Sequence, residues 1–333
     1  MTFSITLTAM NASEEGLNKL DALLKRIEED VHEMEILGAD LLEDTSWFQT
    51  SRPERRLLLM KIATAMLHRP PRVHGPHVQR YEVRDEGSAA QACEVAYTPL
   101  YVLLENDNSD GRLVKFALMA FANRETLDLC YGTGQSRKPK AFEIESRGGV
   151  GELKKLIEKR ADEAAARGFA PRIVVASDSD GEWPGDIKQH AKEIRDTCTN
   201  RGIACPPLNK RTAENYVTDG VWTAWASQPE QTNIRQAIEA LMRLSPVQRD
   251  HVRLDKSNTA PWTRAEPKAA ALFFNVSTAD ETLLITASLK KAAANAMDLA
   301  LGSGLAPSIR ADILSRDPAG ELETLARRIE DYL

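Results

Sequence analysis

Cysteine is scarce in this chain of 333 residues, and the four thiols are scattered along it. Cys93, Cys130, Cys198 and Cys205 form no CxxC pair and no zinc-ribbon spacing, which argues against a disulfide scaffold or a structural zinc site. The sequence also lacks an apolar run of the roughly 20 residues that a membrane-spanning helix needs. No basic segment precedes the apolar stretch at the N-terminus, as it would in a signal peptide. We therefore expect reduced thiols and a cytoplasmic protein with no membrane partner.

An excess of positive charge is absent as well. The chain has 43 Lys and Arg against 49 Asp and Glu, a formal net charge of -6. This balance argues against a simple basic nucleic-acid-binding module. It leaves open an enzyme that gathers acids in a metal site and binds phosphates through a local basic strip. No Walker A sequence, GxxxxGK[ST], occurs anywhere, so no P-loop ATPase is expected in this chain.

Three stretches of different patterning divide the sequence. Residues 1–97 are dominated by helical patterns, with a heptad seam of apolar residues from Leu17 to Met34 and a second helix after Pro53. The seam is short for a coiled coil, so it fits a helix packed inside its own domain as well as the helix of a homodimer. Residues 221–333 are again expected to be a helical region.

Residues 98–220 alternate between strand and helix patterns. Two continuous apolar runs of strand length, PLYVLLE from Pro99 and RIVVASD from Arg172, are typical of strands buried on both faces of a parallel sheet. Further short strands are predicted near 127–131 and 141–144, with helices in between. This alternation predicts an α/β fold, in which a doubly wound parallel-sheet core is flanked by helical N- and C-terminal regions.

Both apolar runs end in acidic residues. Glu105 ends the first run, and Asp178 and Asp180 end the second. Ligands bind beyond the C-terminal ends of parallel strands, so neighbouring strands would bring these three carboxylates together. Unpaired carboxylates repel one another, and a divalent cation removes that penalty. With oxygen ligands and no His or Cys nearby in the sequence, Mg²⁺ or Mn²⁺ is expected rather than Zn²⁺.

The order of these features resembles a known domain. A Glu at the end of one strand, an Asp-x-Asp at the end of a later strand and a Gly-containing turn into a helix between them resemble a TOPRIM domain. The stretch KRTAENY, residues 210–216, resembles the KRxxENY segment of OLD-like (overcoming lysogenization defect) TOPRIM nucleases from anti-phage systems. The resemblance covers residues 100–217, about a third of the chain.

The resemblance implies a TOPRIM-like Rossmannoid core and a Mg²⁺-dependent nuclease that acts on DNA or RNA. The Asp-x-Asp pair would hold one or two cations, and Glu105 would be a further ligand or the general base. Glu214 would complete a second metal position. Lys210 or Arg211 would stabilise charge on the transition state.

The sequence departs from the family in two respects. Asn106 stands where the family often has Gly, so either Asp107 or Asp110 is the equivalent of the next acid, and Asp110 also lies where a helix cap is expected. The ATPase that accompanies OLD nucleases is missing, which implies a separate ATPase or sensor protein as partner. By the same analogy the protein would be the toxic effector of a prokaryotic antiviral defence system. The alternatives are another TOPRIM strand-transfer activity and a non-catalytic module that binds metal or a partner.

Overall fold

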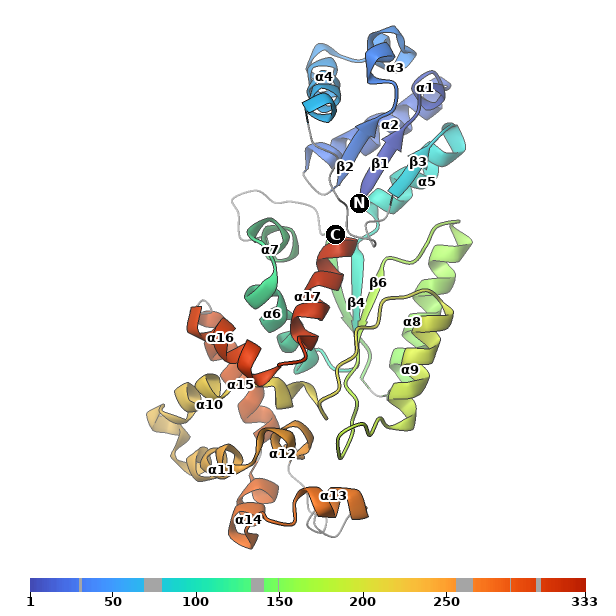
Figure 1. The fold of residues 1–333 in the computed structure, drawn as a ribbon. Coiled ribbons are helices and arrows are strands. Elements are labelled where there is room, and N and C mark those ends of the chain that lie inside the picture. Colours follow the sequence, from blue (N-terminus) through green and yellow to red (C-terminus); the bar gives the residue numbers. More distant parts are fainter. Residues whose placement is uncertain are drawn as a thin grey trace.

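The structure is a computed structural model that describes residues 1–29, 32–68, 80–132, 141–148, 150–255, 266–287, 289–303 and 307–333. Two three-stranded parallel sheets lie within a largely helical chain (Figure 1). The α/β class expected from the sequence is therefore confirmed. Within the described part of the chain, no helix is both long and apolar enough to span a membrane.

The first 97 residues build a small α/β unit, where a helical region was expected. Strands β1 (Thr2–Ile5), β2 (Glu33–Ile36) and β3 (Arg80–Val83) pair in parallel in the order β2-β1-β3. Helices α2 (Glu14–Glu28) and α5 (Glu86–Tyr97) pack against each other beside this sheet (Figure 1). The other helices of the unit are α1 (Leu7–Met10), the 3₁₀ helix η1 (Ala39–Asp44), α3 (Ser46–Thr50) and α4 (Pro53–His68), of which α4 is the helix predicted after the proline.

The predicted heptad seam is wrong beyond the end of α2. The helix ends at Glu28, and Met34 lies in β2, where Met34 and Ile36 are buried and their neighbours are half-buried. Side chains of a strand point alternately to its two faces, with a period of two. The position of Met34 happens to continue the steps of three and four residues that the apolar residues of α2 follow. Leu20 of the seam is buried in the core of the N-terminal unit, so the helix packs inside its own domain. Val31 lies outside the described residues.

The second sheet positions the acids. Strands β4 (Leu100–Leu104), β5 (Phe142–Ser146) and β6 (Ile173–Ala176) are all parallel, in the order β5-β4-β6. A single parallel bridge between Val174 and Ala204 extends the sheet beyond β6. The helices of this region are α6 (Asp110–Phe121), α7 (Arg124–Tyr131), α8 (Val150–Ala166), α9 (Gln189–Asn200) and the 3₁₀ helix η2 (Ala213–Tyr216).

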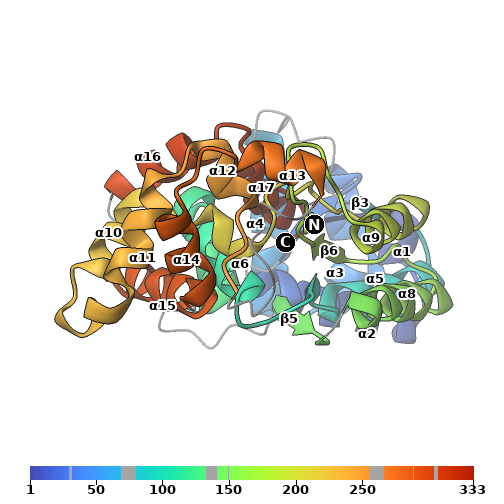
Figure 2. The same cartoon turned by 90° about the horizontal axis from the view of Figure 1, so that it is seen from below.

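Both faces of the second sheet are covered, as the continuous apolar runs predicted. On β4, Val102 and Leu104 pack into the cluster that contains α6, whereas Leu103 packs into the cluster that contains α8 and α9. Figure 2 shows α8 and α9 on the opposite side of β6 from α6 and from α17 (Glu321–Tyr332). The alternation along β4 therefore places the sheet between two layers of helices.

Residues 127–131 belong to α7 and do not form the strand expected from their apolar composition. The Asn123 side chain accepts a hydrogen bond from the backbone N–H of Thr126 at 2.8 Å and caps the helix. Gly132, with a φ of 59°, ends it in the left-handed conformation. These start and stop signals are the ones that favour a short helix.

The described residues after 220 form a helical region, as expected from the sequence. Its helices are α10 (Asp219–Ala226), the 3₁₀ helix η3 (Pro229–Gln231), α11 (Thr232–Arg243), α12 (Pro246–His251), α13 (Pro267–Leu272), α14 (Thr278–Thr286), α15 (Leu289–Gly302), α16 (Pro307–Arg316) and α17. Helices α15 and α17 contact α6. The core of this region is continuous with the α6 face of the second sheet, so the C-terminal helices close over the edge from which the acids project.

Candidate metal centre

Strands β4 and β6 are direct neighbours, which was the condition for a shared acid site. Their register pairs Leu104 with Ala176. Glu105 therefore leaves β4 at the same edge at which the loop carrying Asp178 and Asp180 leaves β6. The structure brings Glu105 and Asp180 together at this edge, and Asp178 lies close enough for their charges to raise its pKa.

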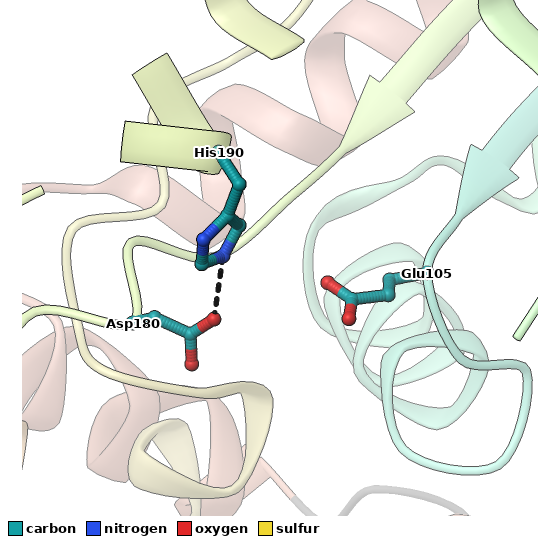
Figure 3. A group of neighbouring side chains, drawn as sticks. All are labelled: Glu105, Asp180 and His190. Atoms are coloured by element: carbon teal, nitrogen blue, oxygen red, sulfur yellow. Dashed lines mark hydrogen bonds and ion pairs between the residues drawn. The ribbon is translucent and has the colours of Figure 1, made fainter. Parts of the chain in front are cut away.

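Three side chains converge at this edge (Figure 3). Glu105, Asp180 and His190 each offer one ligand atom, and these atoms all lie within 4.8 Å of one another. His190, in the first turn of α9, has its Nε2 atom at hydrogen-bonding distance, 2.8 Å, from Oδ2 of Asp180. The three residues are half-buried, and together they can hold a metal ion. The histidine was missed from sequence because it lies ten positions beyond the acidic pair, past a loop whose path no motif specifies.

The backbone fixes the position of Asp180. Its φ of 50° makes it the one non-glycine residue with positive φ in the described ranges, a conformation that Asp tolerates better than most residues. Its backbone N–H donates to the carbonyl of Arg211 at 2.9 Å. A Cβ on the next residue, Gly181, would lie 2.1 Å from the carbonyl oxygen of Asp186. The loop is thus tightly packed, and the Asp180 carboxylate is held in place before any ligand binds.

Further carboxylates lie behind this group. Asp178 accepts a hydrogen bond from the backbone N–H of Ala213 at 3.2 Å. Burial raises its pKa well above the usual value, and the charges of Asp110 and Asp180 raise it further. Burial also raises the pKa of Asp110 to about 7, with Glu214 among the charges that add to the effect.

The pKa of Glu105 is raised by burial first and by the charge of Asp180 second, while His190 and Lys290 act to lower it. The mutual influence of these pKa values defines one electrostatic group, which we call the acid cluster: Glu105, Asp110, Asp178, Asp180 and Glu214. A cation is the direct means of keeping such a group ionised at neutral pH.

Asp107 and Asp110, the two candidates for the next acid, differ in their surroundings. Asp107 is exposed. Asp110, the first residue of α6, accepts a hydrogen bond from the backbone N–H of Asn106 at 3.0 Å and is coupled to Glu105 and Glu214 through its pKa. Ser109 occupies the cap position of the helix, so Asp110 is a member of the acid cluster and not the N-cap.

Glu214 lies at the inner side of the acid cluster. Only 1% of its surface is exposed, and its Oε1 atom has no hydrogen-bond partner in the described structure. The nearest cation is the ammonium of Lys290, 3.8 Å from that oxygen. Burial opposes the charge of Lys290, but Glu214 and Asp110 raise its pKa above the usual value. Lys290 lies far along the chain at the start of α15, in an alanine-rich helix that carries no recognisable motif.

Lys210 does not lie beside the acids, contrary to the prediction. Its buried ammonium donates to Asp250 at 2.5 Å and to the carbonyl of Arg316 at 3.1 Å. The aliphatic and charged parts of the side chain are therefore used to join the segment after β6 to α12 and α16. The sequence could not reveal this ion pair because its partner is 40 residues away.

Most of the KRTAENY stretch is structural. The amide of Asn215 donates to the carbonyls of Arg249 and Val252 at 2.7 and 3.0 Å, and the hydroxyl of Tyr216 donates to Glu321. Arg211 lies closer to the acids, with one guanidinium nitrogen 3.9 Å from Glu182. Burial lowers the pKa of Arg211, while Glu182 and Asp180 act to raise it. Of the seven residues, Glu214 alone joins the acid cluster.

Comparison of the chain with protein-family models, with characterised proteins and with solved structures finds no match. The resemblance to TOPRIM nucleases therefore stays a prediction that rests on the residues themselves.

Proposed function

We propose that this protein is a nuclease that depends on a divalent cation and hydrolyses phosphodiester bonds in DNA or RNA. The observation that carries the proposal is the convergence of Glu105, Asp178 and Asp180 at one edge of a parallel sheet. Their enclosure raises the pKa of Glu105 and of Asp178. An arrangement of this kind is costly for the fold unless it serves to bind a cation.

The donor set fits a divalent ion. Carboxylate oxygens from Glu105 and Asp180 and the nitrogen of His190 would hold it, with Asp178 beside them. Carboxylates suit Mg²⁺ and Mn²⁺, and an imidazole nitrogen shifts the preference toward Mn²⁺. A bound cation would polarise a phosphoryl oxygen of the substrate and offset its negative charge.

Two further steps, activation of the attacking water and neutralisation of charge on the phosphate, would be carried out by residues of the chain. Glu105 would be a ligand of this cation or, in place of that role, the general base for the attacking water. Lys290, beside Glu214, would neutralise charge that develops on the phosphate, the role that the sequence had suggested for Lys210. The order of acids along the two strands supports a nuclease of TOPRIM type.

Cleavage assays on labelled DNA and RNA, with Mg²⁺ or Mn²⁺, test the proposal. We expect cleavage by the wild type and a loss of about 100-fold or more in Glu105→Gln and Asp180→Asn, the size of effect that general-base or ligand residues have. Asp107→Asn is the matched control because that acid is exposed and lies two residues from Glu105. Equal cleavage by all four proteins would remove the proposed site.

The wider role as a toxic effector that a separate ATPase or sensor holds inactive is proposed by analogy. It predicts that expression of the wild type arrests growth of a bacterial host and that Asp180→Asn does not. If purified protein fails to cut but expression is toxic in this residue-dependent way, a partner is required. If neither cleavage nor toxicity occurs while the cation binds, the site is a non-catalytic metal-binding module.

A further inference from the structure

A pocket of about 450 Å³ opens beside the acid cluster. It lies between the loop after β4 and the first turns of α15. Glu214, a member of the acid cluster, lines the pocket, and so does Lys290, whose ammonium lies beside Glu214. The pocket and the candidate metal centre are therefore adjoining parts of one site.

The pocket is lined by three cationic side chains, and by the acids Glu214 and Asp255. Lys290 and Lys291 open α15, a helix of 14 residues whose N-terminus adds a positive field. Lys291 is exposed and makes no ion pair with any residue that the structure describes. Arg112 of α6 also lines the pocket, and its Nε donates to Asp298 of α15 at 2.8 Å, which fixes the guanidinium. A phosphate in the pocket would meet Lys291, and also Lys290, whose ammonium it would share with Glu214.

The pocket also has uncharged polar groups that could hydrogen-bond to a base. The side-chain amides of Asn108 and Asn295 line it and make no hydrogen bond within the described ranges. Carboxamides pair readily with the edges of nucleic-acid bases. Glu214, at 1% exposure, presents an Oε1 atom without a hydrogen-bond partner. That oxygen has the Lys290 ammonium 3.8 Å away, and an amino or hydroxyl group of a ligand would supply the hydrogen bond that it lacks.

We propose that this pocket binds one unpaired nucleotide of the substrate, next to the phosphate that the acid cluster would cut. This inference rests on the proposed nuclease function. The volume lies in the range of small-molecule sites, enough for a single nucleotide and too small for a base pair with both strands. The nucleotide that enters must be unpaired, and a single-stranded segment supplies it without the cost of opening a duplex. Its phosphate would lie on Lys291 and its base edge on the amides.

Titration with adenosine and thymidine 5′-monophosphate in EDTA, followed by calorimetry, tests the pocket without any cleavage. We expect binding by the wild type, at least tenfold weaker binding by Lys291→Glu and by Asn295→Ala, and no change in Lys155→Glu. Lys155 is the matched control because it is an exposed lysine on the remote helix α8. Inorganic phosphate as tight as the nucleotides, or nucleotide affinity unchanged in both pocket variants, would overturn the inference.

A second measurement uses cleavage. The inference predicts that single-stranded oligonucleotides are cut at least tenfold faster than the same sequence in a duplex, and that Lys291→Glu removes this difference. Equal rates on both substrates contradict it while leaving the nuclease intact. If no substrate is cut and expression is not toxic, the proposed function fails, and the nucleotide titration alone decides whether the pocket is a nucleotide site.

Discussion

Replacing Asp110 by Asn should stabilise the metal-free protein, although the residue is a member of the acid cluster. Asp110 is held by the backbone N–H of Asn106 at 3.0 Å and the hydroxyl of Ser109 at 3.1 Å. An asparagine has the same shape and can keep both hydrogen bonds, because the serine hydroxyl can accept as well as donate. What the substitution removes is a negative charge among four other carboxylates.

The magnitude follows from the pKa of this carboxyl, which burial and the neighbouring acids raise from 3.8 to about 7. Because the pKa is higher in the folded state, ionisation of this carboxyl begins to disfavour folding once the pH exceeds its pKa in the unfolded chain. The full effect is reached above its pKa in the folded protein. A shift of roughly 3 units at about 1.36 kcal/mol per unit gives about 4 kcal/mol at pH 8. At pH 5 the folded carboxyl is mostly protonated, and the same reasoning leaves about 2 kcal/mol.

Urea denaturation in EDTA measures this effect directly. We expect Asp110→Asn to unfold at higher urea than the wild type at pH 8, with a smaller gain at pH 5. Saturating Mn²⁺ should stabilise the wild type by about 2.7 kcal/mol at a concentration 100 times the dissociation constant, and the variant by less. A variant that is less stable than the wild type in EDTA, or equally stabilised at both pH values, would refute the reasoning that the acid cluster is electrostatically strained.

Three further predictions test other parts of the structure. Lys210→Met should lower the free energy of unfolding by about 2 kcal/mol through loss of a charged hydrogen bond. Its Mn²⁺ affinity, measured by calorimetry, should stay within threefold of wild type. A loss of Mn²⁺ affinity without a loss of stability would show that Lys210 belongs to the metal site. Gly181→Ala should weaken Mn²⁺ binding at least tenfold, because the new Cβ would meet the Asp186 carbonyl at 2.1 Å, and unchanged binding would show that the loop does not define the site. Burial and Arg172 lower the pKa of His32 to about 2, so the folded protein leaves this histidine neutral while the unfolded chain protonates it below its ordinary pKa. Urea melts should therefore show the wild type losing about 2 kcal/mol more stability than His32→Gln between pH 7.5 and 5. Equal losses in the two proteins would show that the histidine is not buried in its neutral form.

The sequence was most informative where a signal is local. Two continuous apolar runs predicted β4 and β6, and the acids at their ends predicted the edge at which Glu105, Asp178 and Asp180 meet. This works because the position of a residue at the end of a buried strand fixes where its side chain can lie.

The rest of the site depends on contacts between distant segments. His190 reaches Asp180 only because the loop between them folds back, and Lys290 reaches Glu214 only because α15 packs on α6. The same is true of Lys210, whose partner in α12 no local pattern could indicate. In the N-terminal unit, β2 was read as the end of a helix because four residues are too few to distinguish a period of two from a spacing of three and four.

We infer that Glu105, Asp180 and His190 hold a divalent cation at the edge of the second sheet. Anomalous diffraction from crystals soaked in MnCl₂ tests it most directly. We predict a manganese peak at bonding distance, about 2.0–2.3 Å, from oxygens of Glu105 and Asp180 and from Nε2 of His190. Crystals that carry manganese elsewhere, with no peak between these three side chains, would contradict the account.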